Sequence, residues 1–137
     1  MYLLDTVIIS ELRKARPDAG VLRWVAGQQD EQLFLSVVTL GEIEKGIEKQ
    51  RKAAAEFAAE LTVWIEEMIQ IHADRILPVT PGIARHWGRL AARLGNDGAD
   101  LLIAATAQAH GLVVVTRNVG DFEPAGVKVL NPYSNKT

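Results

Sequence analysis

Four acidic residues stand where a folded sheet could bring their carboxylates together. Asp5 directly follows a short apolar run, and Glu42 stands near the start of a predicted helix, just after a second apolar run. Asp100 lies in the first turn of another predicted helix, and Asp121 lies five residues beyond a run rich in Val and Leu. In open α/β folds the ligand crevice lies beyond the carboxyl ends of the strands. We therefore expect the four side chains to converge there.

Converging carboxylates need a cation or a shared proton. Two of them about 5 Å apart repel each other by roughly 3 kcal/mol at an effective dielectric of about 20, and a bound metal or a retained proton relieves that repulsion. Ligands that are all oxygen favour hard ions such as Mg²⁺ or Mn²⁺. Such an ion keeps water molecules and can activate one of them to attack a phosphodiester. We therefore expect a metal site formed by the four acids, and hydrolysis of a phosphodiester as its chemistry.

Each acid also has a simpler explanation. Asp5 fits the N-cap of the helix predicted after it, and Glu42 has capping-box spacing from Thr39. Asp100 gains about 0.3–1 kcal/mol from the helix macrodipole whatever else it does, and Asp121 fits a turn. Because the chain has 17 acidic residues, four of them at strand ends could arise by chance. The residues alone leave both explanations open.

The elements that must position these acids alternate along the chain. Short apolar and β-branched runs predict strands, and apolar residues spaced by three and four predict helices. Strands separated by helices indicate a three-layer α/β/α sandwich with a mainly parallel central sheet. The two helical segments in the middle of the chain are expected to form a long hairpin or a bent pair. The predicted strands span 2–4, 32–37, 75–79, 112–116 and 127–130, and the predicted helices span 7–14, 19–26, a segment from 39, 52–72, 81–94 and 99–110.

The composition is that of a single globular domain, which we expect to span 1–137. Of the 137 residues, 48% are hydrophobic and 23% are charged, which suffices for one sizeable core. The absence of cysteine excludes disulfides and thiolate-bound zinc or iron–sulfur clusters. With a net charge of −2, a polyanion must be met by local basic patches or bound cations. We find neither a signal peptide nor a membrane span, and expect a cytoplasmic protein.

The four acids lie within four longer motifs. These read Leu3-Leu4-Asp5-Thr6-x-Ile8-Ile9-Ser10-Glu11, Ser36-x-x-Thr39-x-x-Glu42-x-x-x-Gly46, Ala99-Asp100-Leu101-Leu102-Ile103-Ala104-Ala105-Thr106-Ala107 and Thr116-Arg117-Asn118-x-x-Asp121-Phe122. In this order they resemble the motifs of PIN-domain toxins of the VapC type, across essentially the whole chain. The closing Asn131-Pro132-Tyr133 is similar to the end of the FitB-like subgroup, which pairs with ribbon-helix-helix antitoxins.

The resemblance implies a Mg²⁺- or Mn²⁺-dependent endoribonuclease toxin of a type II toxin–antitoxin pair, which leaves 5′-phosphate and 3′-hydroxyl ends on RNA. It also implies a cognate antitoxin, a homodimer or higher toxin–antitoxin assembly, and contact with operator DNA only through the antitoxin. By position, the catalytic and metal-binding residues would be Asp5, Glu42, Asp100 and Asp121, with Thr6, Thr116 and Asn118 in support.

One position departs from the family pattern. Family members usually have asparagine after the Asp-Thr pair, where this chain has Val7. The departure puts in doubt a polar contact near the first acid, and it leaves weakened activity open.

Basic side chains near the acids are candidates for binding RNA or an antitoxin. These candidates are Arg13, Lys14, Arg16 and Arg117. Three further arginines recur every four residues on one predicted helix, which is interpreted as a solvated face, with contact to RNA phosphates or to an acidic antitoxin segment as the alternative. These arginines are Arg85, Arg89 and Arg93.

The sequence bears on two alternatives to a nuclease. A haloacid-dehalogenase phosphatase also opens with a strand ending in Asp, but it needs a second Asp two residues later, where Val7 stands. A non-catalytic PIN-like module that only binds RNA or its antitoxin is the main alternative. The presence of all four acids argues against it, because a scaffold has no need to crowd carboxylates.

Overall fold

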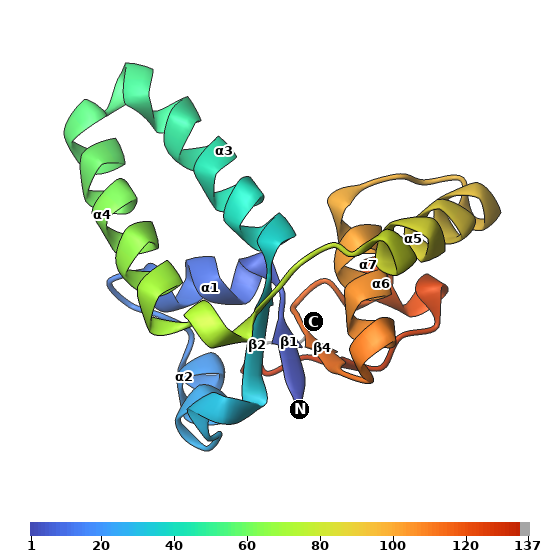
Figure 1. Cartoon of the computed structure of the whole chain (residues 1–137). Coiled ribbons are helices and arrows are strands. Elements are labelled where there is room, and N and C mark those ends of the chain that lie inside the picture. Colours follow the sequence, from blue (N-terminus) through green and yellow to red (C-terminus); the bar gives the residue numbers. More distant parts are fainter. Residues whose placement is uncertain (135–137) are drawn as a thin grey trace.

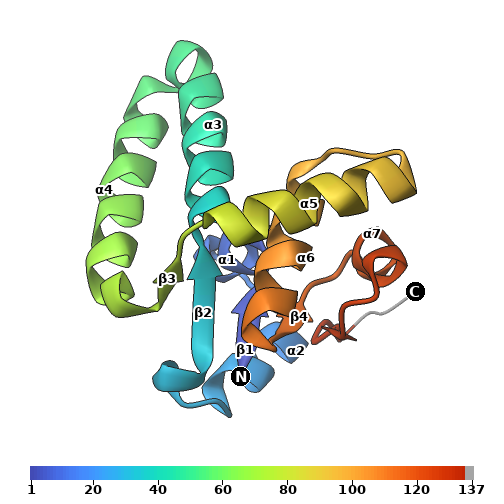
Figure 2. The same cartoon turned by 45° about the vertical axis from the view of Figure 1, so that its right-hand side comes forward.

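The computed structural model describes residues 1–134, and their strands form one parallel sheet (Figures 1 and 2). The strand order is β3-β2-β1-β4-β5, so β1 lies in the centre between β2 and β4. Leu3 on β1 pairs with Phe34 on one side and Val114 on the other. The strands span β1 Tyr2–Leu4, β2 Leu33–Ser36, β3 Ile76–Leu77, β4 Val113–Val115 and β5 Val129–Leu130.

Helices cover both faces of the sheet, which confirms the predicted α/β/α sandwich. The long helices α3 and α4 form the expected hairpin, which extends from the carboxyl end of β2, whereas α5, α6 and α7 lie on the other side of the sheet (Figures 1 and 2). The α-helices of the described part are α1 Thr6–Arg13, α2 Ala19–Ala26, α3 Val37–Ala53, α4 Ala55–Ile71, α5 Pro81–Leu94, α6 Ala99–His110 and α7 Val119–Phe122. Short 3₁₀ turns span Asp30–Gln32, Ala73–Arg75 and Glu123–Ala125.

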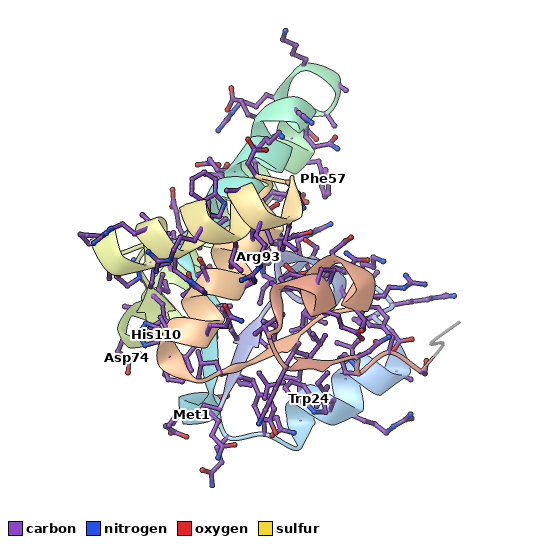
Figure 3. All side chains as sticks on the ribbon, turned by 90° about the vertical axis from the view of Figure 1, so that its right-hand side faces the viewer. Met1, Trp24, Phe57, Asp74, Arg93 and His110 are labelled. Carbon is purple, nitrogen blue, oxygen red and sulfur yellow. The ribbon has the colours of Figure 1, made fainter. Side chains whose placement is uncertain are left out.

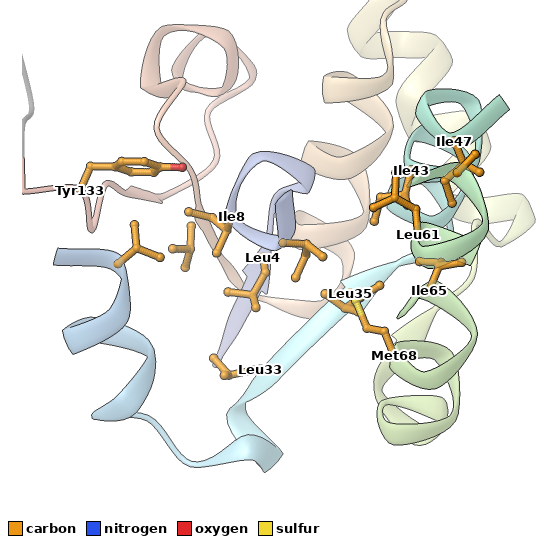
Figure 4. Close-up of a cluster of buried hydrophobic side chains, with 14 residues drawn as sticks. Leu4, Ile8, Leu33, Leu35, Ile43, Ile47, Leu61, Ile65, Met68 and Tyr133 are labelled. Carbon is orange, nitrogen blue, oxygen red and sulfur yellow. The ribbon is translucent and has the colours of Figure 1, made fainter. Parts of the chain in front are cut away.

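Two apolar clusters hold the three layers together. Alternate strand residues point to opposite faces of a sheet, so Leu4 and Leu35 join a cluster with α1–α4 (Figure 4), and Leu3 and Val114 join one with α5–α7. Burying one such side chain contributes roughly 1.5–3 kcal/mol. Both faces of the central strands are therefore committed to packing, and only their carboxyl ends are left for chemistry.

Most predicted elements are confirmed, with ends that differ by a few residues. The helix predicted from Thr39 begins at Val37, and the helix predicted over 52–72 begins at Ala55. The segment of Asp121, interpreted as a possible turn, forms the short helix α7. The strand predicted over 75–79 is only Ile76–Leu77, because just two residues of β2 pair with it. Within residues 1–134 we find no helix with the length and apolarity to span a bilayer.

Candidate active site

Asp5 lies at the point where the order of the strands reverses. From β1 the chain builds β2 and β3 on one side, and then returns to build β4 and β5 on the other. Leu4 pairs with Val115, so the next residues, Asp5 and Thr116, are neighbours at the same edge of the sheet. The amide of Asp5 still donates to the carbonyl of Val115 at 3.0 Å. Crevices at such reversal points are the usual ligand sites of open α/β sheets.

Both carboxylate oxygens of Asp5 are held by hydrogen bonds. Oδ1 accepts from the amide of Thr6 at 2.8 Å, and Oδ2 accepts from the hydroxyl of Thr116 at 2.8 Å. The hydroxyl of Thr116 in turn accepts from the amide of Asn118 at 2.9 Å. Asp5 is only 3% exposed, yet each of its oxygens keeps a second lone pair. The side chain is therefore fixed in place and can still ligate a cation.

Glu42 is tied to the same helix end as Asp5. Its Oε1 accepts from the hydroxyl of Thr6 at 2.6 Å, and that hydroxyl also lies 3.1 Å from the hydroxyl of the buried Thr39. The capping-box explanation of Glu42 is wrong, because α3 begins two residues earlier than predicted. Ser36 caps the helix by accepting from the amide of Val38 at 3.0 Å, which leaves Thr39 and Glu42 free to face α1.

Asp100 and Asp121 come from the other layer of the sandwich. Asp100 lies in the first turn of α6 and is half-buried, and Asp121 is exposed on α7. The backbone of Asn118 begins α7, since its carbonyl accepts from the amide of Asp121 at 3.0 Å. Thr116 and Asn118, predicted as supporting residues, thus connect Asp5 to the helix that carries Asp121.

Electrostatic repulsion connects Asp5 with Asp100 and Glu42, and connects Asp100 with Asp121 and Glu42. Burial raises the pKa of Asp5 to about 6, and the carboxylates of Asp100 and Glu42 raise it as well, against the hydrogen bonds from Thr116 and Thr6. The pKa of Asp100 is also raised, first by burial and then by Asp121 and Glu42.

This acidic group has the donor chemistry of a hard-cation site. The salt bridges within residues 1–134 are Lys14–Glu11, Arg51–Glu48 and Arg75–Asp74, so the four acids have no basic partner there. No three acidic or histidine side chains of the described part are arranged to hold a metal ion among themselves. Mg²⁺, however, is usually bound by one or two carboxylates and keeps several waters. The residues therefore fit such an ion.

Two surface hollows meet at Glu42. One lies between α1 and the α3–α4 hairpin, and the other runs along α3 beside the start of α6. Apart from Glu42, the first is lined by Thr6, Ser10, Arg13, Lys14, Ile43, Gly46, Ile47, Gln50, Phe57, Leu61 and Trp64, and the second by Val38, Gly41, Lys45, Gly46, Lys49 and Ala99.

The basic residues predicted to bind RNA or antitoxin are partly engaged inside the fold. The guanidinium of Arg13 lies 4.9 Å from the ring centre of Phe57, and Lys14 forms a 2.9 Å salt bridge with Glu11. Arg117 lies 5.1 Å from the ring centre of a tyrosine in the C-terminal segment. Arg16 is exposed. Arg13 and Lys14 line the first hollow, whereas Arg16 and Arg117 line neither of the two hollows at Glu42.

Val7, the residue that departs from the family pattern, serves packing. Its side chain contacts the apolar cluster of α1–α4, and its carbonyl accepts from the hydroxyl of Tyr133 at 3.4 Å. The same hydroxyl donates to the buried Glu11, also at 3.4 Å. Tyr133 thereby anchors the C-terminal segment to α1, a contact that the sequence alone did not predict.

Comparison with known proteins places this architecture in a family. Residues 2–124 match the PIN domain family. The VapC ribonuclease Y4jK of Sinorhizobium fredii is 38% identical over 97% of this chain and 98% of that protein. The toxin FitB of Neisseria gonorrhoeae is 32% identical over 97% of this chain and 99% of that protein.

Solved structures agree with the sequence relatives. FitAcB from Neisseria gonorrhoeae has a TM-score of 0.84 at 33% identity, covering 98% of this chain and 100% of that chain. FitAB bound to a DNA fragment has a TM-score of 0.74 at 31% identity, covering 100% and 99%. A member of the VapBC family of toxin-antitoxin systems from Mycobacterium tuberculosis has a TM-score of 0.60 at 26% identity, covering 96% of each chain. The chain therefore belongs to the PIN-domain family, as a toxin of the VapC type.

Proposed function

We propose that this chain is a metal-dependent endoribonuclease toxin that hydrolyses RNA phosphodiester bonds at the group formed by Asp5, Glu42, Asp100 and Asp121. The observation that carries the proposal is the electrostatic coupling of these acids at the carboxyl edge of the sheet, where no basic side chain within residues 1–134 forms a salt bridge with any of them. A relative 38% identical over nearly the whole chain bears the name of a ribonuclease, which supports the same reaction.

We assign the acids the task of holding a divalent cation, Mg²⁺ or Mn²⁺, against the RNA. When bound, the cation supplies positive charge to the phosphate and lowers the pKa of water. Thr116 and Thr6 keep Asp5 and Glu42 in position by donating hydrogen bonds to their carboxylates. The oxygen of water forms a bond to phosphorus as the bond to the 3′-oxygen breaks. The water gives up a proton to solvent and the departing 3′-oxygen takes one up, which leaves a 5′-phosphate and a 3′-hydroxyl.

The relatives of this chain suggest which macromolecules it binds. One solved neighbour belongs to a toxin-antitoxin system and another was solved with DNA. We propose that this chain is inhibited by a cognate antitoxin, forms a homodimer or a larger assembly with it, and reaches operator DNA only through it. We further propose that residues 1–137 act as one PIN domain in the cytoplasm, where RNA substrate is present.

The alternative is a PIN-like module that binds RNA or antitoxin without cutting. Cleavage of total RNA in Mg²⁺ distinguishes the two, with Asp100→Asn as the site variant and Asp97→Asn, which changes an exposed acid three residues away, as its matched control. We expect the cleavage rate of Asp100→Asn to fall at least about 100-fold, which is the upper range for loss of an outer-shell partner of a metal site. The cleavage rate of Asp97→Asn should equal that of the unaltered protein. Equal rates in the three proteins, or cleavage that persists in EDTA, would remove the proposed function.

A further inference from the structure

Three lysines of α3 lie on the same face of the helix as Glu42. Lys45, Lys49 and Lys52 follow Glu42 at intervals of three, four and three residues, and this spacing keeps residues on one side of a helix. At a rise of about 1.5 Å per residue, the lysine row formed by these three residues extends roughly 15 Å from Glu42 along the helix axis. The hairpin of α3 and α4 carries it away from the sheet (Figure 1).

The lysine row lies along a hollow that is continuous with the acidic group. Lys45 and Lys49 line the hollow that contains Glu42 and Ala99, and Ala99 is the chain neighbour of Asp100. The same two lysines also line the next hollow along α3, together with Lys52. A Cβ atom added to Gly41 would meet nothing within 4 Å, so this wall of the hollow is open to a ligand.

The charges of the lysine row are available to a ligand. All three lysines are exposed, and within residues 1–134 none of them takes part in a salt bridge. Arg51, which lines the same hollow as Glu48 and the three lysines, is different, because it binds Glu48 at 2.7 Å. The four acids alone would repel RNA, so a cationic strip next to them is what an extended polyanion needs.

We propose that the lysine row binds the phosphates of the RNA strand beside the scissile bond, along α3. The proposal rests on the ribonuclease function proposed above and adds where the substrate lies. A stacked strand advances about 3.4 Å per nucleotide, so the roughly 15 Å from Glu42 to the far end of the row corresponds to roughly four nucleotides. Lysine binds phosphate as a point charge without reading bases, so the row supplies affinity and direction to the strand rather than sequence choice.

Salt dependence of RNA binding tests this directly. For single strands, each phosphate neutralised contributes about 0.7 to the slope of log affinity against log salt. We expect the triple variant Lys45→Gln, Lys49→Gln and Lys52→Gln to lose about 2 from that slope for labelled poly(U) RNA in EDTA. In cleavage assays its KM should rise while kcat stays within about twofold, because uniform binding is what is lost. The corresponding triple arginine variant should restore the slope.

The matched control removes three charges from α5 instead, as Arg85→Gln, Arg89→Gln and Arg93→Gln; Arg93 is marked on that helix in Figure 3. An equal loss of slope in this control would overturn the proposal, since it would mean that RNA contacts α5 as much as α3 or is attracted diffusely. An unchanged slope in the lysine variant would overturn it too, while cleavage by the unaltered protein would leave the ribonuclease function standing. If the unaltered protein neither binds nor cuts RNA, both proposals fail.

Discussion

The hydroxyl of Thr116 donates a 2.8 Å hydrogen bond to Oδ2 of Asp5, and both residues are buried. The two residues lie 111 positions apart in sequence and meet because β1 and β4 are neighbours in the sheet. The bond opposes the rise in the pKa of Asp5 that burial causes. It therefore keeps a carboxylate charged where the fold would otherwise favour a proton.

The first prediction concerns the loss of this donor. Thr116→Val keeps the shape of the side chain but removes the hydrogen bond to Asp5. Because a hydrogen bond to a charged group contributes about 1.5 kcal/mol or more, we expect the pKa of Asp5 to rise by roughly one unit above its value of about 6. Carbon NMR titration of the carboxyl signals in the metal-free protein measures the shift.

Thr116→Ser is the control for this substitution. Serine retains a hydroxyl that can donate to Asp5 and accept from the amide of Asn118. The pKa of Asp5 should then stay near that of the unaltered protein. A pKa that is the same in the valine and serine variants would show that the hydrogen bond does not hold the charge.

The second prediction is a pH-dependent gain of stability in Asp5→Asn. The folded protein raises the pKa of Asp5 from 3.8 to about 6, so between these values the folded state binds more protons than the unfolded state. The contribution of Asp5 to the free energy of unfolding is thus fully present below about pH 4 and is lost as the pH rises through 6. A pKa difference of about two units corresponds to ~3 kcal/mol of free energy of unfolding. The gain in Asp5→Asn is smaller than this, because the variant also loses the hydrogen bonds to a charged carboxylate.

Urea unfolding of metal-free protein at several pH values measures this difference. At pH 7, Asp5→Asn should be more stable than the unaltered protein by about 1–2 kcal/mol, and the advantage should shrink as the pH falls toward 4. An advantage that grows toward acid pH would mean that Asp5 is not a destabilising charge in the folded protein.

The third prediction concerns the link between Glu42 and α1. Thr6→Val removes the hydroxyl that donates to Glu42 at 2.6 Å, so the carboxylate loses its fixed position. We expect kcat for RNA cleavage to fall by about 10–100-fold, as outer-shell changes at metal sites do. Thr6→Ser should retain most of the rate, and a valine variant as active as the serine variant would rule out a positioning role for Thr6.

The fourth prediction tests the anchoring of the C-terminal segment. A Cβ atom on Gly20 would lie 2.5 Å from the carbonyl oxygen of Pro132 and 2.6 Å from the amide of Ser134. Gly20→Ala must therefore push this segment away from α2. We expect a loss of about 1–3 kcal/mol, the usual cost of overpacking, in urea unfolding. Gly88→Ala, where nothing lies within 4 Å, should not destabilise the protein.

Local signals explain why parts of the fold could be predicted from sequence. Helices α5 and α6 were predicted to the residue, because Thr80-Pro81 starts one and glycines in the left-handed conformation, Gly95 and Gly111, follow both. The start of α3 was not, because Ser36 and Thr39 are both good caps. Which of them is used depends on where β2 stops pairing with its neighbours, and that is a tertiary property.

The candidate site shows the same division. The types and order of the four acids could be predicted from the sequence. The electrostatic coupling of Asp5 to Asp100 could not, because it depends on strand order and burial. The basic candidates near Asp5 in sequence include Arg13 and Lys14, which the fold engages with Phe57 and Glu11. The lysine row of α3 could not be predicted as a binding surface from the sequence, because alternating Glu and Lys in a helix is also the pattern of a solvated face.

Titration of the full-length, metal-free protein with Mn²⁺ by calorimetry tests the central claim most directly, since it needs neither RNA nor an antitoxin. A shared acidic site predicts saturable Mn²⁺ binding that falls at least about 10-fold in Asp100→Asn and is unchanged in Asp97→Asn. Binding of equal strength in all three proteins, or none in the unaltered protein, would contradict the claim that these carboxylates form one cation site.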